Sequence, residues 1–295
     1  MTEKTSSLPI VSLAASQRLG QLAGPKQLEK IVQSAWKSLA LPLLLFIALP
    51  LLALFLRTSP DRFFAELNQP QVIQAIKLSL FTSAVTTALT LAFGTPVAYL
   101  LAQRRFRFYR VVDTLVDLPT VLPPSVAGVA LLMAFGRKGL FGPFLDSMGI
   151  NIPFTLVAVI LAQTFIASPF YVKAAAIGFA AIDPELKQAA ALDGASRWQT
   201  FRYVVLPLSW MSLLSGSVMT WARALGEFGA TIIFAGNFPG RTQTMPLAIY
   251  IGFEIDLNVA LTLAVILVCF SFLTLILVKG ILHRRLDTDR EANAQ

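Results

Sequence analysis

Between two long apolar runs the chain reads Gln188-Ala-Ala-Ala-Leu-Asp-Gly194, and nine residues later it reads Val204-Val-Leu-Pro207. The preceding Asp183-Pro184 is typical of a helix start, because aspartate is a good N-cap and proline fits the first helical turn. Gly194 is free to take the left-handed conformation that ends many helices. We therefore predict a short polar helix over residues 184–192, between two apolar runs.

The residues of this helix predict a surface that a second protein contacts. Glu185 lies near the positive end of the helix dipole, where a carboxylate is favoured. Ala189 and Ala190 leave a smooth surface that another subunit can approach closely. The functional interpretation is a knob that seats in a cleft of a partner, and the alternative is an ordinary connection between two spans. Arg197, Trp198 and Arg202 are spaced for a second short helix at the membrane interface.

The composition predicts a membrane protein. Apolar residues make up 56% of the chain and charged residues 14%, whereas a soluble domain carries about 25% charged residues. Because spanning segments must satisfy their backbone polar groups internally, the apolar runs are expected to be helices. We predict an all-α polytopic fold with about six transmembrane helices at residues 35–56, 77–103, 115–135, 154–180, 205–235 and 259–282.

The third of these spans is expected to be broken. Its first part, Leu118-Pro-Thr-Val-Leu-Pro-Pro-Ser125, contains three prolines, and each one removes a backbone donor and crowds the preceding turn. Pro123 and Pro124 mark the break. The functional interpretation is that they shape a gate, and the alternative is that they cause only a kink.

The basic residues predict the orientation and argue against nucleic-acid binding. The net charge is +8, but the lysines and arginines lie in short segments beside apolar runs, as in membrane proteins. If the N-terminus is cytoplasmic, sixteen of them lie in inner segments and six in outer ones, with Lys173 and Arg223 within spans. We therefore expect a multi-pass protein of the cytoplasmic membrane with both termini and the 188–194 loop inside.

Outside the spans we expect a cytoplasmic tail over residues 1–34 and another over 283–295, flanking a permease domain over 35–282. Residues 25–33 have the pattern of a short interfacial helix, and for residues 1–24 a disordered tail is the equal alternative. The first apolar run is too long for a secretory signal. Cys269 and His283, each the only residue of its type, offer no disulfide, thiolate metal site or catalytic set.

The opening segment resembles the cytoplasmic coupling loop of ATP-binding-cassette (ABC) importer permeases. Their consensus is Glu-Ala-Ala, three residues, Gly, nine residues, Ile, one residue and Leu-Pro. The chain departs from it only where Val204 replaces the isoleucine and Gln188 the glutamate. The resemblance implies the type I importer (MetI-like) transmembrane fold, with a coupling loop at about 181–204. It assigns contacts with an ATPase to Pro184, Glu185, Gln188, Ala189, Ala190, Asp193 and Gly194.

A second set of motifs resembles permeases for molybdate and tungstate. It comprises the segments Trp221–Thr231, Gly236–Tyr250, Leu122–Ser125 and Phe135–Gly139. Sulfate and thiosulfate permeases share the Arg-x-x-Gly-Glu pattern of Arg223 to Glu227 but are less similar in the loop that follows. The resemblance covers about residues 72–282 and implies import of a tetrahedral oxyanion, with sulfate as the alternative substrate.

The resemblance also implies the partners. These are a second copy of the permease in a homodimer, two cassette ATPase subunits, an extracytoplasmic oxyanion-binding protein and the lipid bilayer. The chain has no Gly-x-x-x-x-Gly-Lys-Ser/Thr segment, so ATP and Mg²⁺ are expected to be used by the partner ATPase and no cofactor by this chain.

Several residues are candidates for the translocation path or the subunit interface. Arg223 and Glu227 are four residues apart in an apolar run, and such charges usually face a protein interior or a wet cavity. The alternative is a locally neutralised pair needed only for packing. Gly226 leaves room for another helix. Ser83 and Thr86 lie on the second span, where the alternative is that their hydroxyls satisfy helix carbonyls.

The sequence argues against two other classes of function. An intramembrane enzyme needs convergent catalytic groups within or beside the spans, and one histidine, one cysteine and few acids in the apolar runs argue against it. A passive channel or a scaffold has no need for the asymmetric charged loop at 188–194. We therefore expect a non-catalytic transport subunit.

Overall fold

The computed structural model describes residues 25–104 and 107–292, and they are almost entirely helical. The chain divides into two compact units, Met1–Arg57 and Thr58–Gln295. The helices are α2 (Pro25–Arg57), α3 (Pro60–Leu67), α4 (Pro70–Gln103), α5 (Tyr109–Val121), α6 (Pro124–Phe135), α7 (Gly142–Ser147), α8 (Leu156–Ala180), α9 (Pro184–Leu192), α10 (Arg197–Thr200), α11 (Leu206–Leu208), α12 (Trp210–Leu225), α13 (Gly229–Ala235), α14 (Met245–Ile255) and α15 (Leu257–Ala292), with a π-helix η1 (Phe201–Val205) between α10 and α11.

The first unit contributes the long helix α2. Its segment Trp36–Arg57 is long and apolar enough to cross a membrane, and none of that segment is buried within the chain. Large side chains such as Trp36, Phe46 and Leu56 are exposed along it. The predicted interfacial segment 25–33 is continuous with this helix. Residues 1–24, where a tail is expected, lie outside the described residues.

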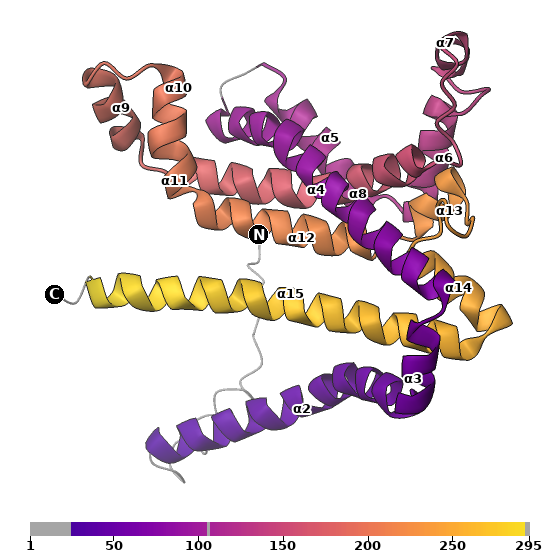
Figure 1. Ribbon diagram of the computed structural model, residues 1–295. Helices are drawn as coiled ribbons and strands as arrows, with labels where there is room; N and C mark the ends of the chain where they lie inside the picture. The colour runs from indigo at the N-terminus through magenta and orange to yellow at the C-terminus, as the bar shows by residue number, and fades with distance from the viewer. Residues whose placement is uncertain (1–24, 105–106, 293–295) are drawn as a thin grey trace, which may run out of the picture. The chain divides into compact units, whose positions relative to one another are not determined.

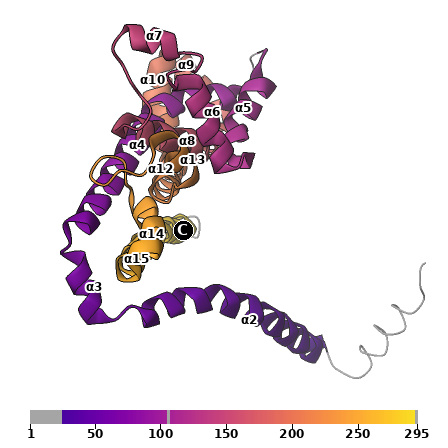
Figure 2. The same ribbon diagram turned by 90° about the vertical axis from the view of Figure 1, so that its right-hand side faces the viewer.

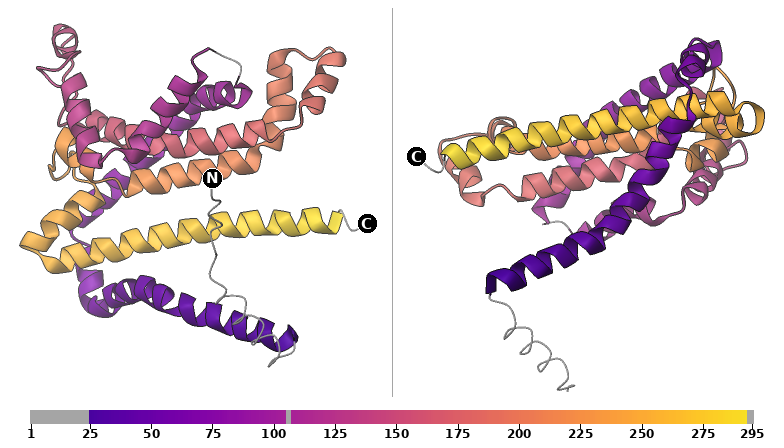
Figure 3. Two further views of the ribbon diagram at one scale, coloured as in Figure 1. Left: turned by 180° about the vertical axis from the view of Figure 1, so that it is seen from behind. Right: turned by 90° about the horizontal axis from the view of Figure 1, so that it is seen from below.

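The core of the second unit is formed by α4, α8 and α12, which lie side by side in Figures 1 and 3. Small and hydroxyl side chains allow this close approach. Thr86 Oγ1 donates to Gln163 Oε1 at 3.1 Å between α4 and α8, and Thr220 Oγ1 on α12 donates to the Ala167 carbonyl of α8 at 3.2 Å. The perpendicular view in Figure 2 shows α14 and α15 lying against each other beside α12.

The two ends of this unit are held by different apolar clusters. At one end, the C-terminal parts of α4 and α8 meet the start of α5 and the α10–α11 connection, in a cluster that includes Leu101, Phe179 and Val205. At the other end, α6, α8 and α13 pack through a cluster that includes Leu131 and Phe234. In Figure 1, α9 and α10 therefore lie at the left, and α7 and α13 at the right. Within this unit, the start of α5 and the α10–α11 connection, two of the segments predicted to share a membrane side, lie at a common end.

Four helices in the described residues are long and apolar enough to span a membrane, and the number is six if each of two bent pairs is one span. The predicted break in the third span is confirmed, because α5 and α6 are bent by 119° at Leu122-Pro123. The fifth span is bent by 72° at Ser209.

The predicted end of the fifth span at residue 235 was wrong. Helix α12 ends at Leu225, and α13 is a separate helix that begins at Gly229. Glu227 lies in the interruption, and its carboxylate accepts a hydrogen bond from the Ala230 backbone N–H at the start of α13. The last helix also differs from the prediction, since α15 continues to Ala292 instead of ending near residue 282.

Helix α14 was not predicted. Its apolar sequence starts with Met245-Pro246 and is too short to cross a membrane alone. The Met245 N–H donates to Ser79 Oγ on α4 at 2.7 Å, and this bond satisfies one of the free backbone donors at the start of α14. Helix α14 therefore packs on α4 and α15 instead of forming a span of its own.

The contact between α8 and α12 depends on Gly178. A Cβ at this position would overlap the Cβ of Ser212 and lie 2.7 Å from Ser212 Oγ. We expect Gly178→Ala to destabilise the protein by about 1–3 kcal/mol because the two helices must move apart. A thermal unfolding assay in detergent measures this loss. Gly280→Ala is the matched control, since a Cβ on Gly280 has no neighbour within 4 Å, and an equal loss in that variant would contradict the explanation.

Candidate functional site

Helix α9 forms the predicted knob, and its ends are closed by local hydrogen bonds. Asp183 Oδ1 accepts from the Glu185 N–H at 2.9 Å, and Pro184 occupies the first helical position. At the other end Gly194 has a φ of +83°. The N–H groups of Gly194 and Ala195 donate to the carbonyls of Ala191 and Ala190 at 3.1 and 3.0 Å. This pattern is a Schellman motif, so the helix predicted over 184–192 is confirmed together with its caps.

The segment that follows is also rigid. Ser196 and Gln199 form a capping box that starts α10, since each side chain accepts from the other residue's backbone N–H. The π-helix η1 then carries Phe201 into the bundle, where its ring packs edge-on against Tyr99 of α4 and Phe179 of α8, with centroid distances of 5.0 and 5.9 Å. The predicted second helix is therefore present, and an aromatic cluster that the sequence analysis missed fixes it to two spans.

The outward face of α9 carries Glu185, Gln188, Ala189 and Leu192, all of which are exposed. Leu192 is 89% exposed, which is unusual for a leucine on a capped helix. The opposite face is turned toward α8, because Lys187 Nζ donates to the Phe179 carbonyl at 3.3 Å. Ala189 therefore lies on the outward face while Ala190 is half-buried. Within this helix, Leu192 is the contact candidate that the sequence analysis missed.

The charged pair predicted in the fifth span forms. Arg223 Nη1 lies 2.8 Å from Glu227 Oε2, and the two side chains are 30% and 1% exposed. Glu227 Oε1 accepts from the Ala230 N–H at 2.8 Å, so both carboxylate oxygens have partners. The pair joins the end of α12 to the start of α13 and does not lie on one continuous helix.

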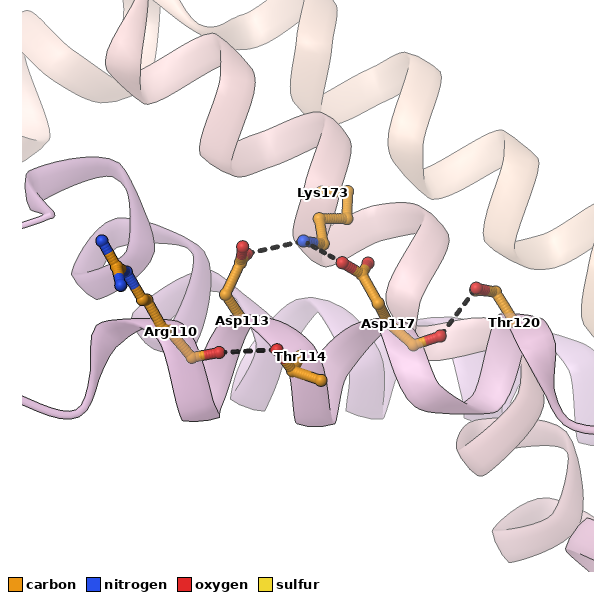
Figure 4. A network of polar contacts seen from close by, with 6 residues as sticks. All are labelled: Arg110, Asp113, Thr114, Asp117, Thr120 and Lys173. Carbon is orange, nitrogen blue, oxygen red and sulfur yellow. Dashed lines mark hydrogen bonds and ion pairs between the residues drawn. The ribbon is translucent and has the colours of Figure 1, made fainter.

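A second ion-paired group was not predicted. Lys173 Nζ of α8 lies 2.6 Å from Asp113 Oδ1 and 2.8 Å from Asp117 Oδ2, one helical turn apart on α5. Figure 4 shows the lysine between the two carboxylates. The three side chains are 31–48% exposed. A charged residue in each of two apolar runs was a signal for such pairing, because ionisable groups within a membrane usually find a partner.

The two hydroxyl candidates on α4 are buried inside the chain. Ser83 and Thr86 are 0% exposed. Ser83 Oγ donates to the Leu80 carbonyl, and Thr86 Oγ1 contacts α8 through Gln163. The expectation that they line a path or a subunit interface therefore finds no support here, because hydroxyls that satisfy helix groups inside one chain are not accessible to a transported anion.

The remaining candidates lie at the two interruptions. Pro123 and Pro124 are exposed at the α5–α6 break. A Cβ on Gly229 would lie 2.7 Å from Pro124 Cβ, so this break packs against the start of α13. Gly226 is exposed, and a Cβ there would have no contact closer than 3.7 Å. The helix expected to approach Gly226 is thus not supplied by the described part of this chain.

The fold is that of the membrane subunits of ABC importers. A solved bacterial alginate ABC transporter, in complex with an alginate pentasaccharide-bound periplasmic protein, contains a chain that aligns with a TM-score of 0.65. The alignment covers 88% of this chain and 96% of that one, with 18% sequence identity.

Sequence comparison identifies the family. The model for the binding-protein-dependent transport system inner membrane component matches residues 94–289, and the chain belongs to this family. It is 41% identical over 79% of its length to the molybdenum transport system permease protein ModB of Mycobacterium tuberculosis, 88% of which is covered. It is 35% identical to the molybdate/tungstate permease protein WtpB of Thermococcus kodakarensis (82% and 93% covered), and 34% identical to the sulfate permease protein CysT of Salmonella typhimurium (78% and 85% covered). The chain is therefore a multi-pass membrane protein with a MetI-like importer fold.

Proposed function

We propose that this chain is the permease subunit of an ATP-driven importer for a tetrahedral oxyanion, with molybdate or tungstate as substrate. The observation that carries the transport role is α9, a capped helix that projects from the end of two spans and exposes Leu192. The relatives named for molybdenum and molybdate/tungstate support the substrate. Such a dianion needs a protein path, because moving a charge into hydrocarbon is very costly.

The proposed assembly contains two copies of this chain and two ATPase subunits, which bind and hydrolyse ATP with Mg²⁺. Helix α9, through Pro184, Glu185, Gln188, Ala189, Ala190, Asp193 and Gly194, seats in a cleft of the ATPase. Its ordered caps favour this role, because a preorganised element loses little entropy on docking. An extracytoplasmic binding protein delivers the anion at the opposite end, which carries α7 and the loop at 236–244.

In the proposed orientation, the end of the bundle with α9 faces the cytoplasm, together with both termini. The excess of basic residues in the segments on this side supports the orientation. In the assembled transporter, Arg223 and Gly226 line the path or the contact between the two copies, Glu227 holds Arg223 in place there, and the break at Pro123 and Pro124 contributes to the gate of the path. The support for these roles is that Arg223 and Gly226 are not fully buried within the described part of the chain.

Reconstitution tests the proposal. The permease, produced with a cassette ATPase and an oxyanion-binding protein, is placed in liposomes, and molybdate uptake is followed with and without internal ATP. We expect uptake that needs ATP, Mg²⁺ and the loaded binding protein. Uptake without ATP would indicate a passive channel, and absence of a complex with the ATPase would contradict the transport role.

Sulfate is the second candidate substrate, and the likeness to CysT is the observation that favours it. Molybdate, tungstate and sulfate share charge and shape, so the permease alone discriminates poorly among them. Competition by unlabelled tungstate and sulfate in the same liposomes separates the candidates. We expect tungstate to compete at concentrations where sulfate does not, and the reverse order would assign the chain to sulfate.

A further inference from the structure

The Arg223–Glu227 pair differs from an ordinary ion pair in how its two members are exposed. Glu227 is 1% exposed, and its two oxygens are occupied by Arg223 Nη1 and by the Ala230 N–H. Each oxygen of the Glu227 carboxylate therefore has a partner, and these two contacts hold the side chain in place. The Arg223 side chain is 30% exposed, so the cation and not the anion faces outward.

The guanidinium retains donors for a ligand. An arginine has five N–H groups in a planar fork, and the only partner that the described residues give Arg223 is Glu227. The adjacent backbone leaves room, since Gly226 is exposed and a Cβ on it would find no atom closer than 3.7 Å. A planar fork beside open space is the arrangement that suits two oxygens of a tetrahedral oxyanion.

Arg223 lies in the last turn of α12, far from the bend at Ser209. It lies thirteen residues beyond Trp210, which corresponds to about 20 Å along a helix axis at 1.5 Å per residue. A charged side chain within a span faces protein or a water-filled cavity, because exposure to lipid is costly. The exposed part of Arg223 therefore faces either the path or the second copy of the chain.

The local charge around Arg223 differs from that around Lys173, a second cation within the spans. Lys173 lies between two carboxylates, so that group has a net charge of −1 and repels a dianion. The Arg223–Glu227 pair is neutral overall and presents its positive member outward. A neutral pair attracts an anion without holding it as strongly as an isolated cation would.

We propose that Arg223 binds the oxyanion directly during its passage, and that Glu227 is a positioning residue that orients the guanidinium and weakens its hold so that the anion is released. This inference rests on the proposed transport function. It goes beyond that function because it assigns the anion-binding group. It also predicts that removing the charge of Arg223 weakens anion binding, whereas removing the charge of Glu227 strengthens it.

The test uses the whole transporter in liposomes with saturating molybdate-loaded binding protein. In the double variant Arg223→Gln/Glu227→Gln the guanidinium is absent and no unpaired charge is left buried. We expect its uptake to fall by about tenfold while its ATP hydrolysis stays within about twofold of the wild type. Arg223→Lys keeps the positive charge but not the planar fork of N–H donors. Its uptake rate should therefore lie between those of the double variant and the wild type. Arg62→Gln is the matched control, since Arg62 lies on α3, outside the spans, and contacts Asn258 at the start of α15, and it should transport normally.

Glu227→Gln tests the second half of the proposal with a different readout. The guanidinium then has no opposing charge, and we expect the purified complex to retain about one molybdenum per transporter after turnover, whereas the wild type retains little. Elemental analysis of the washed complex measures this.

The possible outcomes distinguish the role of Arg223 from the proposed transport function. If the wild type imports molybdate with ATP but the double variant keeps more than about one fifth of its rate, the role of Arg223 is overturned and the transport function stands. If the double variant fails to assemble, Arg223→Lys and Glu227→Gln decide. Normal uptake in Arg223→Lys, or no extra molybdenum in an assembled Glu227→Gln complex, overturns the inference. If the wild type itself shows no ATP-driven uptake of any oxyanion, the proposed function fails.

Discussion

Gly194→Val is expected to abolish most ATP-driven uptake while the amount of protein inserted in the membrane stays unchanged. Gly194 ends α9 with a φ of +83°, which a β-branched residue adopts at a cost of about 1–3 kcal/mol. That cost lowers the population of the native helix end by about 5- to 150-fold. A Cβ at this position would have no neighbour within 4 Å, so the substitution strains the backbone without creating a clash in the core.

The strain should act on coupling alone, because α9 projects from the bundle and contributes no buried residue. Uptake and ATP hydrolysis stimulated by the binding protein are measured in parallel on the same liposomes. Gly194→Asn is the matched control, since asparagine tolerates the left-handed conformation and should retain most of the uptake. Normal uptake in Gly194→Val would show that the Schellman end of α9 is not needed for coupling.

Lys173→Met is expected to lower the thermal stability of the purified permease. The substitution leaves Asp113 and Asp117 without a partner, one turn apart on α5. Removing one member of a fully buried ion pair costs about 3–5 kcal/mol. Because these side chains are 31–48% exposed, we expect a smaller loss of about 1–3 kcal/mol.

The unfolding midpoint in detergent, followed by tryptophan fluorescence, measures this effect, and we expect a fall of about 5 °C. Lys173→Arg keeps the charge and should be close to the wild type. The triple variant Lys173→Met/Asp113→Asn/Asp117→Asn removes the repulsion and should recover most of the midpoint. If the single and triple variants were equally unstable, lost packing and not charge would be the cause.

The elements that were predicted well from the sequence are those whose ends depend on interactions between residues close together along the chain. Asp183, Pro184 and Gly194 act through hydrogen bonds and backbone preferences within a few residues, so the ends of α9 followed from the residues themselves. The same holds for the break at Pro123-Pro124, because a proline disrupts its own preceding turn wherever it occurs. The four uninterrupted spans followed from composition and run length.

The features that the sequence did not predict depend on contacts between distant segments. Arg223 and Glu227 are spaced as on a continuous helix, and only the packed structure shows that Glu227 instead lies in the interruption between α12 and α13. Lys173 and Asp113 are sixty residues apart in the sequence, so neither residue alone predicted the other as its partner. Ser83 and Thr86 have the composition of a polar path, but whether a hydroxyl faces a cavity or a neighbouring helix depends on where α8 lies.

The sequence by itself determined that the chain is a helical membrane protein and where the short polar helix α9 begins and ends. Only the tertiary structure decided which polar groups remain accessible and which are used to hold helices together. The physical reason is that helix caps and apolar length are properties of neighbouring residues, whereas the burial of a charge or a hydroxyl is set by whichever distant helix packs against it.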